Sequence, residues 1–186
     1  GAPARRRAGA VTWARPRGQE LGQGVVVGAT KHRVPRWCTE GMAVHEETAA
    51  SPEWGDRLDP HAIGAIKNKK LLPIATLDRG FVRPSYPMQV IVSYFQAGRI
   101  CDFISQKWGD QKLLDMMNAY AQKKETVEVV ETQLGMKTEE FDKQFLAWLE
   151  AQTKKTVEAF DSWQKRLKKT GTNAKDNKWR AGITEG

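Results

Sequence analysis

The sequence PRWCTEGMAVHEE, residues 35–47, carries the clearest helix start in the chain. A proline in the first turn of a helix fixes φ and loses no hydrogen bond, because the first N–H groups of a helix have no partner there. Trp37 and the pair Glu40-Gly41 then lie at the beginning of the helix, which we expect to end before Ser51-Pro52. The ordered part of the chain is therefore expected to begin near this helix.

Downstream of this helix the apolar residues follow helical spacing. Between residues 88 and 108 they recur at steps of three and four, which places them on one face of a helix that Gly109 ends. Residues 112–121 and 127–134 form two more apolar-striped helices, and Gly135 ends the second of them. The sequence therefore predicts a mainly α fold.

The last part of the chain combines helix signals with a polar end. Thr138 is a good N-cap, and Glu139 follows in the first turn, where the helix dipole favours anions. The side chains of Phe141, Phe145, Trp148 and Leu149 then face one core. A further amphipathic stretch follows within residues 151–186, and its polar end, residues 170–186, is expected to be disordered.

Two stretches differ from these helices. Residues 1–30 are rich in Arg, Gly and Ala, and we expect this atypical segment to be poorly ordered. Residues 52–88 contain five of the eight prolines and form loops around a short helix near 61–68, so this segment can wall a cleft. The expected organisation is the atypical segment, a helical domain at residues 31–150, and an amphipathic helix with a disordered tail at residues 151–186.

The net charge of +8 invites a nucleic-acid interpretation, but the charge is uneven along the chain. Residues 1–37 hold eight basic residues against one acidic residue, and residues 151–186 hold nine against four. Residues 38–150 hold thirteen basic and seventeen acidic residues, so the part with the helix signals is acidic. Basic ends are more often solvated tails than phosphate-binding surfaces, and the arginines at 5–7 have no interleaved aromatic residues. We therefore expect no nucleic-acid partner.

The composition argues against a membrane-spanning helix and against a disulfide scaffold. The chain has 186 residues, 40% of them hydrophobic, which suffices for one globular domain with a core. No run approaches the roughly 18 apolar residues of a membrane-spanning helix, so we expect no membrane segment. Two cysteines, Cys38 and Cys101, are too few for a disulfide scaffold, and their apolar surroundings favour buried free thiols over a disulfide.

The helix at residues 35–47 also carries a motif. Its Trp37, Glu40, Gly41 and Ala43 resemble the W-x-x-E-G-x-A segment of gluzincin metallopeptidases. Those enzymes take two histidines from HExxH on one helix and a carboxylate from a second helix. The Glu of HExxH is their general base on a zinc-bound water, and the zinc polarises the scissile carbonyl. The resemblance implies zinc as the cofactor, Glu40 as its carboxylate ligand, and a peptide or protein as the substrate.

The resemblance extends over residues 31–150. KNKKLLPIATLDRGF at 67–81 is similar to the cleft segment of the peptidase MA-like domain, and the helices at 92–117 resemble its middle helices. LGMKTEEFDKQFLAWL at 134–149 resembles its closing helix. The resemblance implies the helical C-terminal part of a zincin-like metallopeptidase domain. Such domains are often followed by tetratricopeptide repeats in bacterial proteins. The resemblance also suggests an envelope or exported location, although we see no export signal in the sequence.

The chain departs from the family at the metal-binding motif, because no HExxH occurs in it. Counting back from Glu40, the expected position reads QELGQ, so Gln19 and Gln23 stand in place of the histidines and Glu20 in place of the base. An amide oxygen is a poor zinc ligand beside imidazole, so we expect zinc to bind weakly or not at all. The alternative is that residues 1–30 do not represent the family's native segment.

Tyrosine and histidine supply the other candidate site residues. Tyr94 aligns with the tyrosine that donates a hydrogen bond to the oxyanion in related gluzincins, and its place on the apolar stripe equally suits a core tyrosine. His45 lies five residues after Glu40, off its helical face, which favours a structural role. His32 follows a lysine in a basic loop, and His61 is expected at a helix start.

Two functions are compatible with these residues. The first is a zinc metallopeptidase-like hydrolase domain that is inactive or truncated as written, because the loss of both imidazoles removes the Lewis acid and the activated water together. The alternative is a non-catalytic helical module in which a cleft between the Glu40 helix and the Tyr94 helix binds extended peptides without cleaving them.

Overall fold

The computed structural model describes residues 34–50 and 58–173. Every regular element within these ranges is helical, which confirms the mainly α fold, and none of these helices is long and apolar enough to cross a bilayer. The predicted poor order of residues 1–30 lies outside the described residues. The elements are α2 (Arg36–Ala50), α4 (Pro60–Lys67), the 3-10 helix η1 (Ile74–Thr76), α5 (Arg79–Val82), α6 (Gln89–Trp108), α7 (Asp110–Ala121), α8 (Thr126–Leu134) and α9 (Thr138–Asn173).

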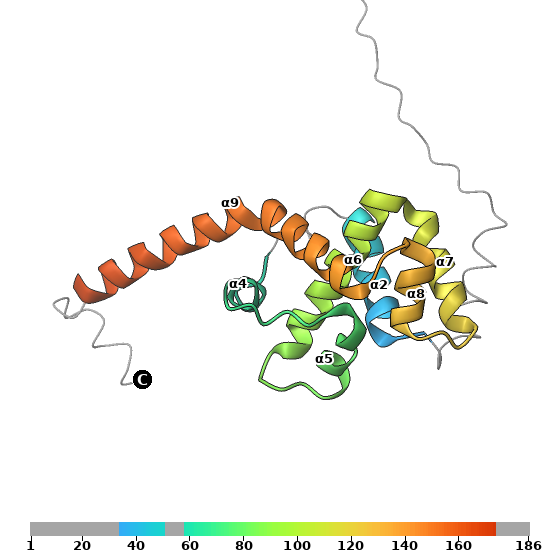
Figure 1. The fold of residues 1–186 in the computed structure, drawn as a ribbon. Coiled ribbons are helices and arrows are strands. Elements are labelled where there is room, and N and C mark those ends of the chain that lie inside the picture. Colours follow the sequence, from blue (N-terminus) through green and yellow to red (C-terminus); the bar gives the residue numbers. More distant parts are fainter. Residues whose placement is uncertain (1–33, 51–57, 174–186) are drawn as a thin grey trace, which may run out of the picture.

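Helix α6 is the centre of the fold, and α2, α4, α5, α7 and α9 pack against it (Figure 1). The predicted apolar stripe is confirmed, since Ala97, Cys101 and Ile104 are fully buried and Tyr94 and Trp108 are half-buried. A helix with neighbours on several sides needs residues that tolerate burial around most of its circumference. Ten of the 20 residues of α6 are accordingly buried.

Helices α2 and α6 approach each other so closely that their crossing requires glycine. A Cβ atom on Gly41 would lie 2.6 Å from the backbone oxygen of Ala97, and one on Gly98 would lie 2.5 Å from Cγ1 of Val44. Both distances are shorter than any real carbon contact. Because Gly41 has no side chain, α2 can pack directly against α6 at the position after Glu40.

An aromatic cluster joins α6 to the first turns of α9. Phe103 lies at its centre, with ring centroids 5.4–5.7 Å from those of Trp108, Phe141 and Trp148. Phe145 follows at 6.0 Å. These are the separations at which aromatic pairs stabilise a fold beyond the area they bury. The prediction that Phe141, Phe145, Trp148 and Leu149 face one core is confirmed.

Helix α9 is one continuous helix of 36 residues, not a core helix followed by a separate amphipathic stretch. No proline interrupts residues 138–169, so nothing in the backbone chemistry ends the helix. The predicted disorder of residues 170–186 is wrong for 170–173, which continue the helix. The distal half projects from the other helices (Figure 1), and Trp163 and Leu167 are about half exposed on it, at 49% and 50%.

Candidate functional site

The N-terminus of α2 is capped by a side chain from a distant part of the chain. The carboxylate of Asp78 accepts hydrogen bonds from the backbone N–H groups of Arg36, at 3.2 Å, and Trp37, at 2.8 Å. The first N–H groups of a helix have no partner within it, and a carboxylate there also interacts favourably with the helix dipole. Asp78 therefore fixes the turn of α2 that carries Glu40.

Glu40 lies one turn into α2, on the edge of its buried face. Its side chain is 29% exposed, and its Oε1 lies 3.3 Å from Nε of Arg36 on the same helix. Trp37 and Gly41 on either side are buried, so the backbone that carries Glu40 is held by the core. The carboxylate is thus placed by packing and still reaches solvent.

Tyr94 lies on α6 and packs its ring edge-to-face on Phe81, at 5.1 Å between centroids. In the part of the chain that the structure describes, its hydroxyl has no hydrogen-bond partner. The two helices run parallel, because Gly41 lies against Ala97 and His45 against Asp102. This register puts Glu40 and Tyr94 at the same end of the helix pair.

The close crossing corrects one expectation about this region. A peptide-binding cleft between the Glu40 helix and the Tyr94 helix was the basis of the non-catalytic alternative. The helices instead meet backbone to backbone at Gly41 and Ala97, which leaves no room for a peptide at the crossing. A peptide that reaches Glu40 and Tyr94 has to approach from beyond the ends of the two helices.

The opposite end of the helix pair is closed by a polar network around His45. Its Nδ1 lies 2.6 Å from Oδ1 of Asp102, and its Nε2 lies 3.8 Å from Asp110. Asp102 also pairs with Arg99 at 3.3 Å. The hydrogen bond to Asp102 raises the pKa of His45, burial opposes the shift, and the charges of Asp102, Asp110 and Glu46 add to it. His45 is therefore a structural residue, as its spacing from Glu40 indicated.

The remaining candidates divide between the core and the undescribed segments. Cys38 and Cys101 are buried free thiols, as expected, and burial raises the pKa of Cys38 to about 12. Thiols in this state are not nucleophiles at neutral pH. His61 is at a helix start, since its backbone N–H bonds Asp59 at the beginning of α4. His32 lies outside the described residues, as do Gln19, Glu20 and Gln23.

The residues present do not fit a complete zinc site. Residues 34–50 and 58–173 contain no group of three side chains that could hold a metal ion. Among the described residues, Glu40 has near it the carboxylate of Asp78, which is occupied by the N–H groups of Arg36 and Trp37, and His45 is engaged at the other end. The two further ligands implied by the resemblance are Gln19 and Gln23, whose amide oxygens suit hard cations better than zinc. This donor set disagrees with the catalytic zinc of gluzincins.

The class of the protein, a peptidase-like helical domain, follows from its match to a family model. A comparison with family models matches residues 19–151 to the Peptidase MA superfamily, and the chain belongs to this superfamily. The matched range includes Gln19, Glu20 and Gln23. Comparisons with curated proteins and with solved structures found no match.

The sequence singled out Glu40 and Tyr94 as candidate site residues, but it did not indicate which other residues hold this region in place. Asp78 was not singled out, because a cap supplied from another part of the fold has no local signature. The amide of Gln96 was also missed, although it bonds both the N–H of Leu72, at 3.0 Å, and its carbonyl oxygen, at 2.5 Å. A polar residue within an apolar helix stripe is the one sequence signal that would have identified Gln96 as buried and paired.

Proposed function

We propose that this chain derives from a gluzincin-type metallopeptidase domain, that it covers the part after the HExxH motif, and that QELGQ at residues 19–23 stands in place of that motif. In this proposal Glu40 is the carboxylate ligand and Tyr94 the hydrogen-bond donor to the oxyanion. Membership of the Peptidase MA superfamily supports the proposal at the level of the fold. The single observation that carries it is the register of α2 and α6, which puts these two residues at one end of a rigid helix pair.

In this proposal the carboxylate of Glu40 and the hydroxyl of Tyr94 can both interact with an incoming group. The carboxylate of Glu40 pairs only with an exposed arginine one turn earlier, and such a pair is worth little and exchanges readily. The Tyr94 ring is held by Phe81, so its hydroxyl is positioned by ring packing and not by a hydrogen bond within the described residues. A hydroxyl held this way can donate to an incoming oxygen without first breaking a bond.

We further propose that the chain as written does not hydrolyse peptides. Gln19 and Gln23 supply no imidazole, and Glu20 in the position of the base then has no activated water beside it. The domain therefore retains the groups that would position a substrate and lacks those that would activate the nucleophile.

Elemental analysis of the purified chain, prepared without chelators, tests this proposal. We expect far less than one zinc per chain, no change on Glu40→Ala, and no cleavage of an unstructured protein such as casein. One zinc per chain that is lost in Glu40→Ala would contradict the proposed inactivity, because it would mean that other residues complete the site. One zinc per chain that Glu40→Ala leaves unchanged would contradict the role of Glu40.

A further inference from the structure

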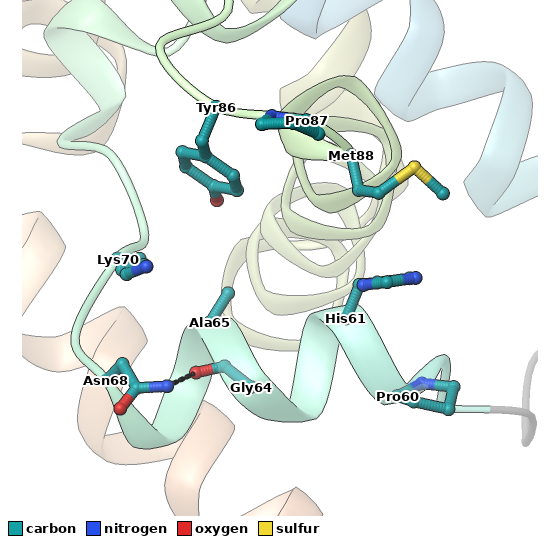
Figure 2. A pocket seen from close by; sticks show the side chains of 9 residues that line it. All are labelled: Pro60, His61, Gly64, Ala65, Asn68, Lys70, Tyr86, Pro87 and Met88. Carbon is teal, nitrogen blue, oxygen red and sulfur yellow. Dashed lines mark hydrogen bonds between the residues drawn. The ribbon is translucent and has the colours of Figure 1, made fainter.

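A small pocket lies between α4 and the loop that leads into α6 (Figure 2). Its volume is about 230 Å³, enough for a small organic molecule. It is separate from the Glu40 end of the helix pair, since α2 contributes no residue to it. The lining residues are Pro60, His61, Gly64, Ala65, Asn68, Lys70, Tyr86, Pro87 and Met88.

The hydroxyl of Tyr86 is the polar group that most needs a partner in this pocket. Its oxygen is buried, and within the described residues nothing bonds to it. Figure 2 shows it directed from the loop toward α4, whereas the His61 ring points away from it. Burial raises the pKa of Tyr86, so the hydroxyl keeps its proton and acts as a donor. A buried donor without an acceptor is costly, and an oxygen-bearing ligand in the pocket would remove that cost.

The charge around the pocket favours an anion. Lys70 places its ammonium nitrogen 5.2 Å from the centre of the Tyr86 ring, and His61 lines the other side. The pocket lining contains no Asp or Glu. Asp59, the nearest acidic residue in sequence, accepts the N–H of His61 and caps α4. The ammonium of Lys70 and the hydroxyl of Tyr86 therefore both line the pocket, and no carboxylate in the lining neutralises them.

The rest of the lining is apolar and held in place. Pro60, Ala65, Pro87 and Met88 surround the polar pair with hydrocarbon. Met88 has a left-handed backbone, with φ 69°, which a non-glycine residue rarely adopts and which the surrounding structure must impose. A ligand with a short apolar body beside its charged group matches this arrangement.

We propose that this pocket binds a small organic carboxylate with a short aliphatic body. The carboxylate accepts hydrogen bonds from Tyr86 and Lys70, and the aliphatic part contacts Pro87 and Met88. The source of such a group is either a free short-chain acid or the C-terminal residue of a peptide. The proposal does not depend on zinc, Glu40 or Tyr94.

Calorimetry of the whole chain with isovalerate tests the proposal, with isovaleramide as the neutral isostere. A ligand of this size is expected to bind with a dissociation constant of about 1 mM. Tyr86→Phe and Lys70→Gln should each weaken binding about fivefold to tenfold, because each removes one charge-assisted hydrogen bond. Lys143→Gln, which removes the same charge from an exposed position on α9, should leave binding unchanged.

A second measurement distinguishes the two sources and does not depend on the variants folding. In the unaltered protein, NMR shifts of the Met88 methyl group and the His61 ring should move on titration with isovalerate. The tripeptide Gly-Gly-Val with a free C-terminus should move the same signals if peptide ends are accepted, and its amidated form should not. The proposal is wrong if isovaleramide binds as tightly as isovalerate, if isovalerate does not bind, or if Lys143→Gln weakens binding as much as Lys70→Gln.

Discussion

The two ends of the α2–α6 pair differ in how far their polar groups are satisfied. At the C-terminal end, His45, Asp102 and Arg99 form a network in which each member has a charged partner. At the N-terminal end, Glu40 has only an arginine of its own helix, and the Tyr94 hydroxyl bonds to none of the described residues. The helix crossing between them is rigid. One end of the pair is therefore held by paired charges, whereas the other end carries two polar side chains with few partners among the described residues.

The largest expected effect comes from separating the two helices. Gly41→Ala puts a Cβ 2.6 Å from the backbone oxygen of Ala97, and backbone atoms on both sides have to move to accept it. We expect a loss of about 3 kcal/mol in the free energy of unfolding, measured by urea denaturation.

Gly64→Ala is the matched control, because nothing lies within 4 Å of the Cβ it would add. It should be neutral or stabilise α4 by up to about 1 kcal/mol through helix propensity. An equal loss in the two variants would show that the close crossing of α2 and α6 is not what makes Gly41 necessary.

A smaller effect is expected at the N-terminal end alone. Asp78→Ala removes the acceptor of two N–H groups at the start of α2, which should lower the free energy of unfolding by about 1–2 kcal/mol. Asp78→Asn keeps one acceptor oxygen and should lose less. Hydrogen exchange should report the change first at residues 36–40 of α2 and not near His45. Uniform loss of protection along α2 would contradict a local capping role.

The smallest effect is expected at the C-terminal end, and it depends on pH. The folded pKa of His45 lies above 6.5, so the stability from its pair with Asp102 is fully present below pH 6.5 and is lost as the pH rises through the folded value. For a partly exposed pair such as this one, the amount is about 0.5–1 kcal/mol at low salt.

Thermal denaturation of the unaltered chain and of Asp102→Asn at several pH values measures this term. The variant should lack the decline above pH 6.5, and His61→Gln, which leaves the His45 pair intact, should retain it. A decline that persists unchanged in Asp102→Asn would exclude this pair as its source.

Local patterns were sufficient to predict most of the helices. Apolar residues at steps of three and four and the glycines at 109 and 135 act within one turn, so the ends of α6 and α8 agree with the sequence. The capping of α2 by Asp78 and the contact between Gly41 and Ala97 join residues more than forty positions apart, and no local spacing encodes them. The pocket beside Tyr86 was missed for the same reason, although its segment was expected to wall a cleft.

The extent of α9 was missed for a different reason. Its distal half has the polarity of a separate surface helix, and the polar residues that follow resemble a tail. Helix propagation needs only that each added residue extends the hydrogen-bond ladder, and no proline interrupts it here. Composition therefore predicted correctly that this segment is exposed to solvent, but it placed the end of the helix too early.

If Glu40 is the carboxylate ligand proposed above, it should complete a zinc site once histidines replace Gln19 and Gln23. Zinc content of the double variant Gln19→His/Gln23→His, compared with the single variant Gln19→His and with the double variant carrying Glu40→Gln, tests this most directly. The account predicts about one zinc per chain in the double variant, and much less in both comparisons. A double variant that holds no more zinc than the unaltered chain, or that keeps its zinc without Glu40, would contradict it.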